Sequence, residues 1–227
     1  MSPHRINRAE VLTPGRIRHL LRVTDATSTQ PQRDAVILLL GLTCGMRITE
    51  IAQITVSDVC FPSGRLRHEV SLRAAITKGC RQRCVYLAND KLIAALERYL
   101  EYRVAHSLGA TLDRTQYRGL HADLPLVLSR KGYPYALNKK RRPDETGVVT
   151  EYWAADSLQA YVTGLYKAAG TAGSSHSGRR TFATRLLAKG ADIEKVQLLL
   201  GHEGIDQTRR YIDVDPAVLQ RAFEDAF

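Results

Sequence analysis

Residues 176–211, HSGRRTFATRLLAKGADIEKVQLLLGHEGIDQTRRY, are the most informative part of the chain because they contain two helix patterns together with their end signals. Their spacing predicts a helix over 177–189, with Gly190 as the C-terminal cap. Asp192 starts a second helix, and Gly201 ends it. One face of this second helix carries apolar residues at helical spacing, namely Ile193, Val196, Leu199 and Leu200. The C-terminal third of the chain is therefore predicted to be helical.

Helical patterns continue outward from this stretch. Thr13 and Pro14 have the form of an N-cap followed by proline, which predicts a short helix running to Val23. A mostly apolar helix is predicted over 32–43, and helical spacing resumes in CGMRITEIAQI from Cys44. Further helices are predicted over 89–106, over 157–169 and from about Pro216 onward.

Two segments change to the alternating pattern of β-strands. Residues 66–76 and 82–87 alternate, and Lys78 and Gly79 lie between them, so we expect a small antiparallel sheet with a tight turn. The region 107–124 is polar and poorly patterned, and 137–150, which contains NKKRRPDE, is predicted to be an exposed basic loop. The expected fold class is mainly α with a small antiparallel β-sheet (α+β).

Composition narrows the class of function. The chain of 227 residues has a net charge of +10, because 33 Lys and Arg outnumber 23 Asp and Glu. Such an excess favours a nucleic acid partner, with a basic protein lacking one as the alternative. No apolar run approaches the roughly 20 residues of a membrane helix, and the N-terminus lacks the apolar core of a secretory signal. We therefore expect a cytoplasmic protein with no membrane partner. We expect no metal site and free thiols at the four cysteines, Cys44, Cys60, Cys80 and Cys84, which form no CxxC pair.

Breaking a DNA phosphodiester without a metal requires three kinds of group. A nucleophile must attack phosphorus, cations must stabilise the non-bridging oxygens, and the leaving 5′-oxygen needs a proton. Arginine suits the second task because its fork donates two hydrogen bonds to a phosphate, and a hydroxyl side chain can be the nucleophile. The sequence offers these groups in the order GMRITEI (45–51), TKG (77–79), HSGR (176–179), LLGH (199–202) and then Tyr211, nine residues beyond His202.

This order of motifs resembles the phage integrase, or tyrosine recombinase, family. The family pattern is G-x-R-x-x-E, a hairpin lysine, H-x-x-R, L-G-H and a tyrosine about nine residues beyond. The resemblance covers nearly the whole chain from Thr13 onward and implies the catalytic-domain fold of the family. It also implies a site-specific recombinase that acts in DNA integration, excision or resolution, needs no cofactor, and works as a tetramer on two paired sites of double-stranded DNA.

The resemblance assigns roles to the matching residues. Arg47 and Arg179 would clamp the scissile phosphate. Tyr211 would be the nucleophile and would form a 3′-phosphotyrosine, and because the usual tyrosine pKa is near 10, a base or cationic surroundings must help it. Lys78 would be the general acid for the leaving 5′-oxygen.

Two histidines and a glutamate complete the predicted site. His176 would orient groups or accept the proton of the nucleophile, and His202 would donate a hydrogen bond to the phosphate. Our hypothesis for Glu50 is that it holds an arginine or histidine in place. We further expect basic residues to contact DNA, with a solvated charged surface as the alternative for the loop; these residues are Arg81, Arg83, Lys139, Lys140, Arg141 and Arg142.

The chain also departs from the family pattern. We expect residues 1–12 to form a basic leader and 13–227 the catalytic domain, without the N-terminal helical domain that closes around DNA in the family. Gly178 stands where the family often has an apolar residue, and we expect its low helix propensity to loosen the placement of Arg179. Two other functions stay open, a non-catalytic DNA-binding protein of the same fold and a type IB topoisomerase.

Overall fold

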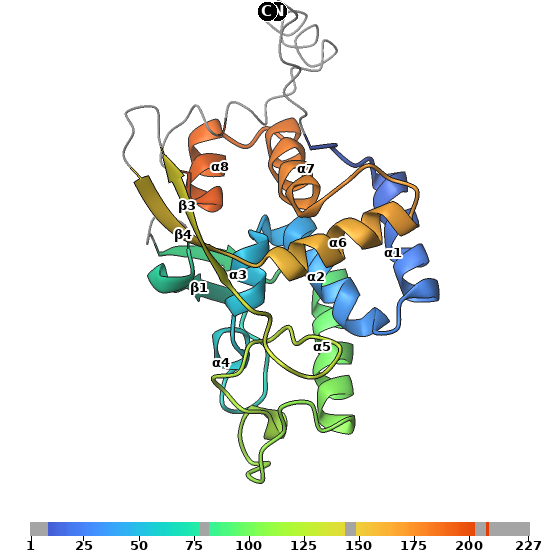
Figure 1. The fold of residues 1–227 in the computed structure, drawn as a ribbon, viewed down its shortest axis with the longest axis vertical. Helices are drawn as coiled ribbons and strands as arrows, with labels where there is room; N and C mark the ends of the chain where they lie inside the picture. Colours follow the sequence, from blue (N-terminus) through green and yellow to red (C-terminus); the bar gives the residue numbers. More distant parts are fainter. Residues whose placement is uncertain (1–8, 78–81, 144–148, 203–207, 209–227) are drawn as a thin grey trace, which may run out of the picture.

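Helices surround a central apolar helix in the computed structural model, which describes residues 9–77, 82–143, 149–202 and 208 (Figure 1). The central helix is α2 (Pro31–Cys44), and most of its residues are buried. It contacts α1 (Pro14–Thr27), α5 (Asp90–Ala105) and α7 (Ser175–Ala188). The apolar run predicted over 32–43 is therefore the centre of the core.

The remaining helices are short or lie on the outside of this core. Thr13 caps α1 as predicted, because its Oγ1 accepts a hydrogen bond from the backbone N–H of Arg16 at 3.3 Å, but α1 continues four residues beyond Val23. The others are α3 (Ile48–Gln53), α4 (Val56–Val59), α6 (Asp156–Ala168), α8 (Ile193–Leu200) and two 3-10 turns, Ala74–Ile76 and Tyr117–Gly119.

The predicted antiparallel pair is confirmed, although its strands are shorter than the pattern indicated. Strand β1 (Glu69–Leu72) pairs with β2 (Arg83–Tyr86), with Glu69 opposite Tyr86 and Leu72 opposite Arg83. The 3-10 turn after β1 takes up the last three residues of the segment 66–76. The turn expected at Lys78 and Gly79, and the helix expected from Pro216, lie outside the described residues.

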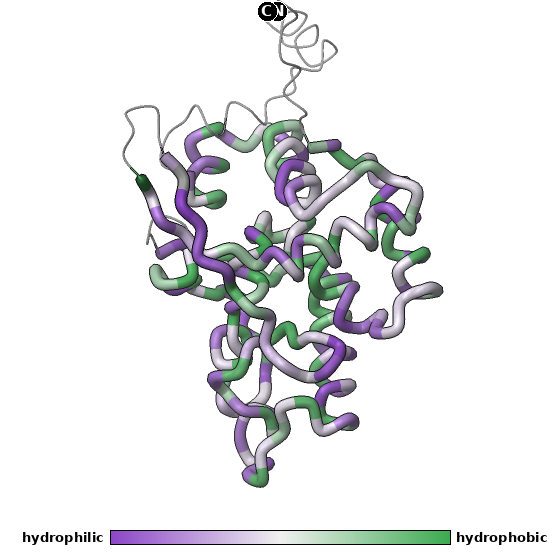
Figure 2. Tube along the Cα trace, in the orientation of Figure 1, coloured by the Kyte–Doolittle hydropathy of each residue, from purple (hydrophilic) through white to green (hydrophobic). Residues whose placement is uncertain are grey.

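The loop prediction for 137–150 is wrong. Strand β3 (Asn138–Pro143) pairs with β4 (Val149–Ala154) in a second antiparallel sheet, with Lys139 opposite Trp153 and Arg141 opposite Glu151. Both faces of this ribbon face solvent, so its sequence lacks the alternation of apolar and polar residues by which strands are detected. Figure 2 shows β3 as a nearly continuous hydrophilic stretch.

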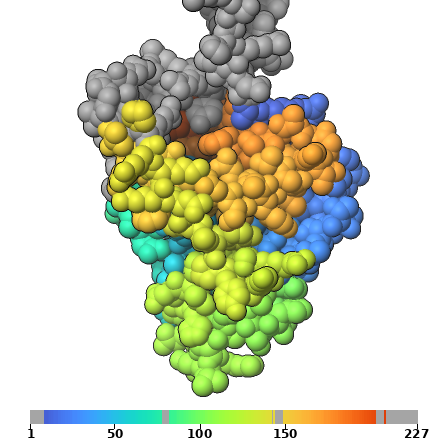
Figure 3. Space-filling view, viewed as in Figure 1, coloured from blue at the N-terminus to red at the C-terminus, as the bar shows by residue number. Residues whose placement is uncertain are grey.

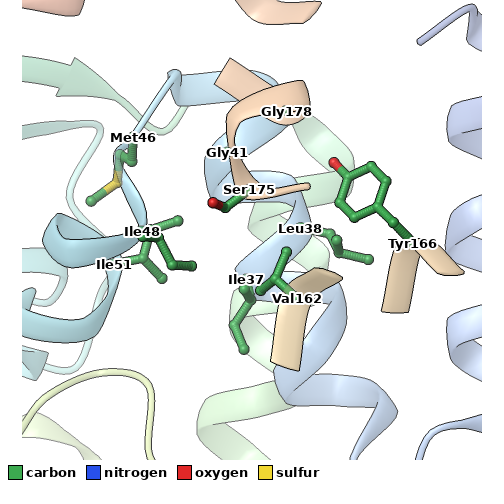
Figure 4. Close-up of a pocket in the computed structure, with 10 residues that line it drawn as sticks. All are labelled: Ile37, Leu38, Gly41, Met46, Ile48, Ile51, Val162, Tyr166, Ser175 and Gly178. Atoms are coloured by element: carbon green, nitrogen blue, oxygen red, sulfur yellow. The ribbon is translucent and has the colours of Figure 1, made fainter. Parts of the chain in front are cut away.

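Gly178 brings α7 close to α2 and does not leave it loose. A Cβ atom at Gly178 would lie 3.2 Å from the carbonyl carbon of Gly41, so the two backbones meet at a pair of glycines. Figure 4 shows this contact above a small apolar pocket that also involves Met46 and Tyr166. The expectation that Gly178 loosens Arg179 is therefore wrong, because the glycine permits the close approach that holds the helix bearing Arg179 against the core.

The architecture confirms the expected class, mainly helical with small antiparallel sheets. None of the helices in the described ranges is long and apolar enough to cross a membrane.

Candidate active site

Three arginines from three different elements bind the C-terminal end of α8. Arg47 is the N-cap of α3, Arg83 begins β2, and Arg179 lies in α7. Their guanidinium groups donate to successive backbone carbonyls, Arg83 to Leu199 at 2.6 Å, Arg179 to Leu200 at 2.5 Å and Arg47 to Gly201 at 3.0 Å. The last carbonyls of a helix lack partners within the helix and carry partial negative charge, which is why cations gather there.

Glu50 is fully buried among these arginines. Its Oε1 accepts from Nη1 of Arg47 at 2.9 Å, and its Oε2 accepts from Nη2 of Arg83 at 2.6 Å and from the backbone N–H of Arg47 at 2.7 Å. Burial alone would raise the pKa of the Glu50 carboxyl, but Arg83, Arg47 and Arg179 outweigh it and hold that pKa below its usual value. Glu50 is therefore ionised and fixes two arginines relative to each other.

Gly45 connects the end of α2 to this cluster. Its φ of 61° lies in the left-handed region, and a Cβ there would lie 2.5 Å from the ring of Phe182. Its carbonyl accepts a hydrogen bond from Nη1 of Arg179 at 2.5 Å. The glycine of the motif GMRITEI is thus required by backbone conformation and by space, and it positions Arg179 as well as Arg47, two residues further along the chain.

The two histidines differ in exposure. His202 follows the cap of α8 and is buried, and its Nδ1 lies 2.8 Å from Oγ1 of the buried Thr208. Burial and the charges of Arg179 and Arg47 lower the pKa of His202 to about 3. His176 is exposed in the first turn of α7, and partial desolvation together with the same two arginines lowers its pKa as well. Both imidazoles are therefore predominantly neutral at pH 7.

The structure brings six of the predicted residues together around the end of α8, namely Arg47, Glu50, Arg83, His176, Arg179 and His202. Three others, Lys78, Arg81 and Tyr211, lie outside the described residues. Tyr211 is three residues along the chain from Thr208, the partner of His202.

Arg83 is a correction to the predicted DNA contacts. Its side chain is 4% exposed and is turned inward to Glu50 and α8, so it does not face a DNA partner. Sequence reasoning missed this role, although a signal was present. Arg83 and Val85 alternate along β2 with the more exposed Cys84 and Tyr86, which places Arg83 on the inward face of the strand.

The basic residues of 139–142 lie on β3 in the exposed ribbon. Lys139 and Arg141 both pair with Glu151, at 2.5 Å and 2.9 Å, and Lys140 pairs with Asp156 at 2.7 Å. Arg142 belongs to the same strand, opposite Thr150. This cationic strand is separate from the buried arginine cluster.

The described ranges offer no metal centre. They contain no group of three or more His, Cys, Asp or Glu residues that could hold a metal ion. Cys44, Cys60 and Cys84 are free thiols, and burial raises the pKa of Cys44 and of Cys60 to about 11. These two thiols are therefore protonated at neutral pH.

The model of the phage integrase family matches residues 10–217. The chain belongs to the phage integrase family. Among similar curated proteins, tyrosine recombinase XerC of Myxococcus xanthus is 32% identical over 207 residues, covering 91% of this chain and 59% of the relative. Tyrosine recombinase XerD of Staphylococcus epidermidis is 28% identical over 214 residues, covering 94% of this chain and 61% of the relative. The chain thus spans about three fifths of the length of these integrase-family relatives.

Solved structures show the same fold. The XerA recombinase has a TM-score of 0.66 at 19% identity, with 100% of this chain and 66% of that chain covered. The Tn1549 transposon integrase, in complex with transposon right end DNA, has a TM-score of 0.62 at 20% identity, with 96% and 66% covered. The family resemblance and the fold inferred from the motifs are confirmed.

Proposed function

We propose that this chain is the catalytic part of a site-specific DNA recombinase that cuts and rejoins DNA strands through a covalent bond to Tyr211. The observation that carries the proposal is the convergence of Arg47, Arg179, His176 and His202 on the end of α8, at the family's motif positions. A cluster of guanidinium groups beside neutral imidazoles suits a phosphodiester, because it supplies fixed positive charge and hydrogen-bond donors together.

The arginines would bind the scissile phosphate. The Arg47 side chain is 21% exposed, and its guanidinium has donors beyond those that meet Glu50 and Gly201. Thr208 would donate its hydroxyl to Nδ1 of His202, which leaves the ring proton on Nε2. In that form His202 would donate a hydrogen bond to a non-bridging oxygen.

The chemistry follows from these contacts. The hydroxyl oxygen of Tyr211 attacks phosphorus as its proton passes to a base, for which His176 is the candidate because its lowered pKa keeps it neutral. The bond to the 5′-oxygen breaks, and Lys78 gives that oxygen a proton. The product is a 3′-phosphotyrosine and a free 5′-hydroxyl. Attack by the 5′-hydroxyl of a partner strand reverses these steps and rejoins the DNA.

The partners are double-stranded DNA and further copies of the protein, assembled as a tetramer on two sites. Support comes from relatives named tyrosine recombinases and from the Tn1549 integrase, whose structure contains transposon DNA. Residues 13–227 would form the catalytic domain.

A covalent-trapping assay tests the proposal. The protein is incubated with DNA from its own genomic neighbourhood, nicked near the candidate site so that the short fragment with the free 5′-hydroxyl is lost and religation is blocked. A protein–DNA adduct that resists SDS and disappears in Tyr211→Phe is the expected result. Salt-sensitive DNA binding without any adduct would overturn the proposal in favour of a binding protein. Relaxation of any supercoiled plasmid regardless of sequence would point to a topoisomerase.

A further inference from the structure

The β3–β4 ribbon is an exposed element whose charge the buried site does not use. In the described chain no third strand pairs with it, and the side chains described on both faces are exposed or half-buried. The two strands carry four cations, Lys139 to Arg142, and one carboxylate, Glu151. Trp153 is 54% exposed on the same ribbon, opposite Lys139. Exposed cations and an exposed indole therefore lie together on the ribbon.

The ribbon is anchored to the helices that hold the site. Asp156, the first residue of α6, accepts a hydrogen bond from Asn138 at 2.9 Å and pairs with Lys140 at 2.7 Å. Helix α6 in turn contacts α3 and α7, which carry Arg47 and Arg179. Along the long axis of the molecule, the far end of the ribbon reaches the level of α8 (Figure 1), and the yellow ribbon flanks the orange helices in Figure 3.

The shape and charge of the ribbon fit a groove of duplex DNA. The major groove of B-DNA is about 12 Å wide and admits a two-stranded β-ribbon. Six residues at about 3.4 Å each span roughly 20 Å, which corresponds to about six base pairs. Glu151 alone serves both Lys139 and Arg141, so phosphates can replace it as their partner without leaving a buried charge behind.

We propose that the β3–β4 ribbon is a DNA-binding arm that lies in the major groove beside the cleavage position and extends the recognised site by about six base pairs. The location beside the cleavage position rests on the proposed function. The binding of duplex DNA by the ribbon does not, because it follows from the exposed cations and the shape of the ribbon.

The test compares two double variants of the full chain that each remove two exposed arginine or lysine charges. The ribbon variant is Lys139→Gln with Arg141→Gln. The matched control is Arg18→Gln with Arg22→Gln on α1, which lies on the opposite side of the view in Figure 1. Affinity for the trapped site is measured by fluorescence anisotropy over a range of salt, and protection of the DNA is measured by footprinting.

We expect the ribbon variant to bind at least about tenfold more weakly, because two charge-assisted contacts are lost. Its slope of log K against log salt should be smaller by about 2. Its footprint should lose about six base pairs on one side of the cleavage position. The control should keep the wild-type slope and footprint. A charge-preserving variant, Lys139→Arg with Arg141→Lys, should keep the slope and so shows that the loss is not misfolding.

An unchanged slope and footprint in the ribbon variant would overturn the proposal. So would an unchanged footprint combined with loss of assembly on paired sites, because the ribbon would then contact a second copy of the chain. The proposed function fails in a different measurement, the absence of a Tyr211-dependent adduct with the wild-type protein. In that case the salt slope on any duplex still decides whether the ribbon binds DNA.

Discussion

Replacing Glu50 with glutamine should destabilise the protein strongly while keeping the shape of the side chain. Glu50 is fully buried and contacts Arg83 at 2.6 Å and Arg47 at 2.9 Å. Removing one partner of a buried ion pair costs about 3–5 kcal/mol. Because Arg47 is partly exposed and glutamine can still accept one hydrogen bond, we expect a loss of about 3 kcal/mol in the free energy of unfolding at pH 7. That is a large part of the roughly 5–15 kcal/mol that holds a typical domain together.

Urea unfolding followed by circular dichroism measures this loss. Glu151→Gln is the control, because Glu151 also meets two cations but on the exposed ribbon, and its urea midpoint should match the wild type. Because folding lowers the pKa of Glu50, the direction in which its contribution to stability changes with pH can also be checked. A carboxyl whose pKa is lowered by folding contributes stability above its unfolded pKa, and that contribution is lost as pH falls through the folded value. The gap between wild type and Glu50→Gln should therefore be constant at neutral pH and shrink below about pH 4. A loss under about 1 kcal/mol at pH 7 would refute the reasoning that Glu50 neutralises a buried cluster.

Three further predictions follow from the same geometry. The folded-state pKa of His202, about 3, lies below its unfolded value, so the free energy of unfolding of the wild type should fall by up to about 4 kcal/mol as pH drops from 6.5 toward 3. Urea unfolding at pH 7 and pH 4 should show a smaller fall in His202→Gln, and equal falls in the two proteins would contradict the assignment. Gly164→Ala, which has nothing within 4 Å of the new Cβ, should stabilise α6 by up to about 1 kcal/mol. Gly178→Ala should be about 1 kcal/mol or more less stable than Gly164→Ala, because its Cβ would lie 3.2 Å from the α2 backbone. Equal urea midpoints for the two variants would contradict the close approach of α7 to α2. Arg47→Lys should slow single-turnover adduct formation by about 100-fold or more, because an ammonium group cannot replace the forked donor of a guanidinium. The control Arg22→Lys should keep the wild-type rate. A loss of rate under about threefold in Arg47→Lys would show that Arg47 does not bind the scissile phosphate.

The sequence predicted the elements whose signals are local. Helix α8 was found from Asp192, whose side chain accepts from the N–H of Glu194 at 3.0 Å, and from Gly201, whose φ is 61°. The apolar α2 and the alternating pair β1–β2 were found because each buries one face or one continuous stretch of side chains. In these cases the residues that determine the backbone conformation also produce the sequence pattern from which it is predicted.

The missed features depend on partners distant in the chain. Cross-strand ion pairs and Asp156, not an apolar face, hold the ribbon in place. Its sequence therefore lacks the apolar–polar alternation that would have predicted two strands. From the sequence, Gly178 indicates only a weak helix former. Its role in packing depends on the backbone of Gly41, which belongs to another helix and is distant in the chain. The inward turn of Arg83 requires a buried carboxylate to receive it, and that carboxylate lies 33 residues earlier in the chain.

The charges of the site explain why it suits a phosphodiester. Three guanidinium groups, which do not lose their protons at physiological pH, surround the carboxylate of Glu50. Those of Arg47 and Arg83 contact it directly, and the charges of all three lower its pKa. The imidazoles of His176 and His202 stay neutral because burial, together with that positive charge, lowers their pKa values. Fixed cations therefore supply charge, and neutral histidines supply proton donors and acceptors. A bound phosphate would add the missing negative charge, and the same cations would favour the ionised form of an attacking tyrosine. The same positive charge would therefore bind the phosphate and make the tyrosine hydroxyl easier to ionise for its attack on phosphorus.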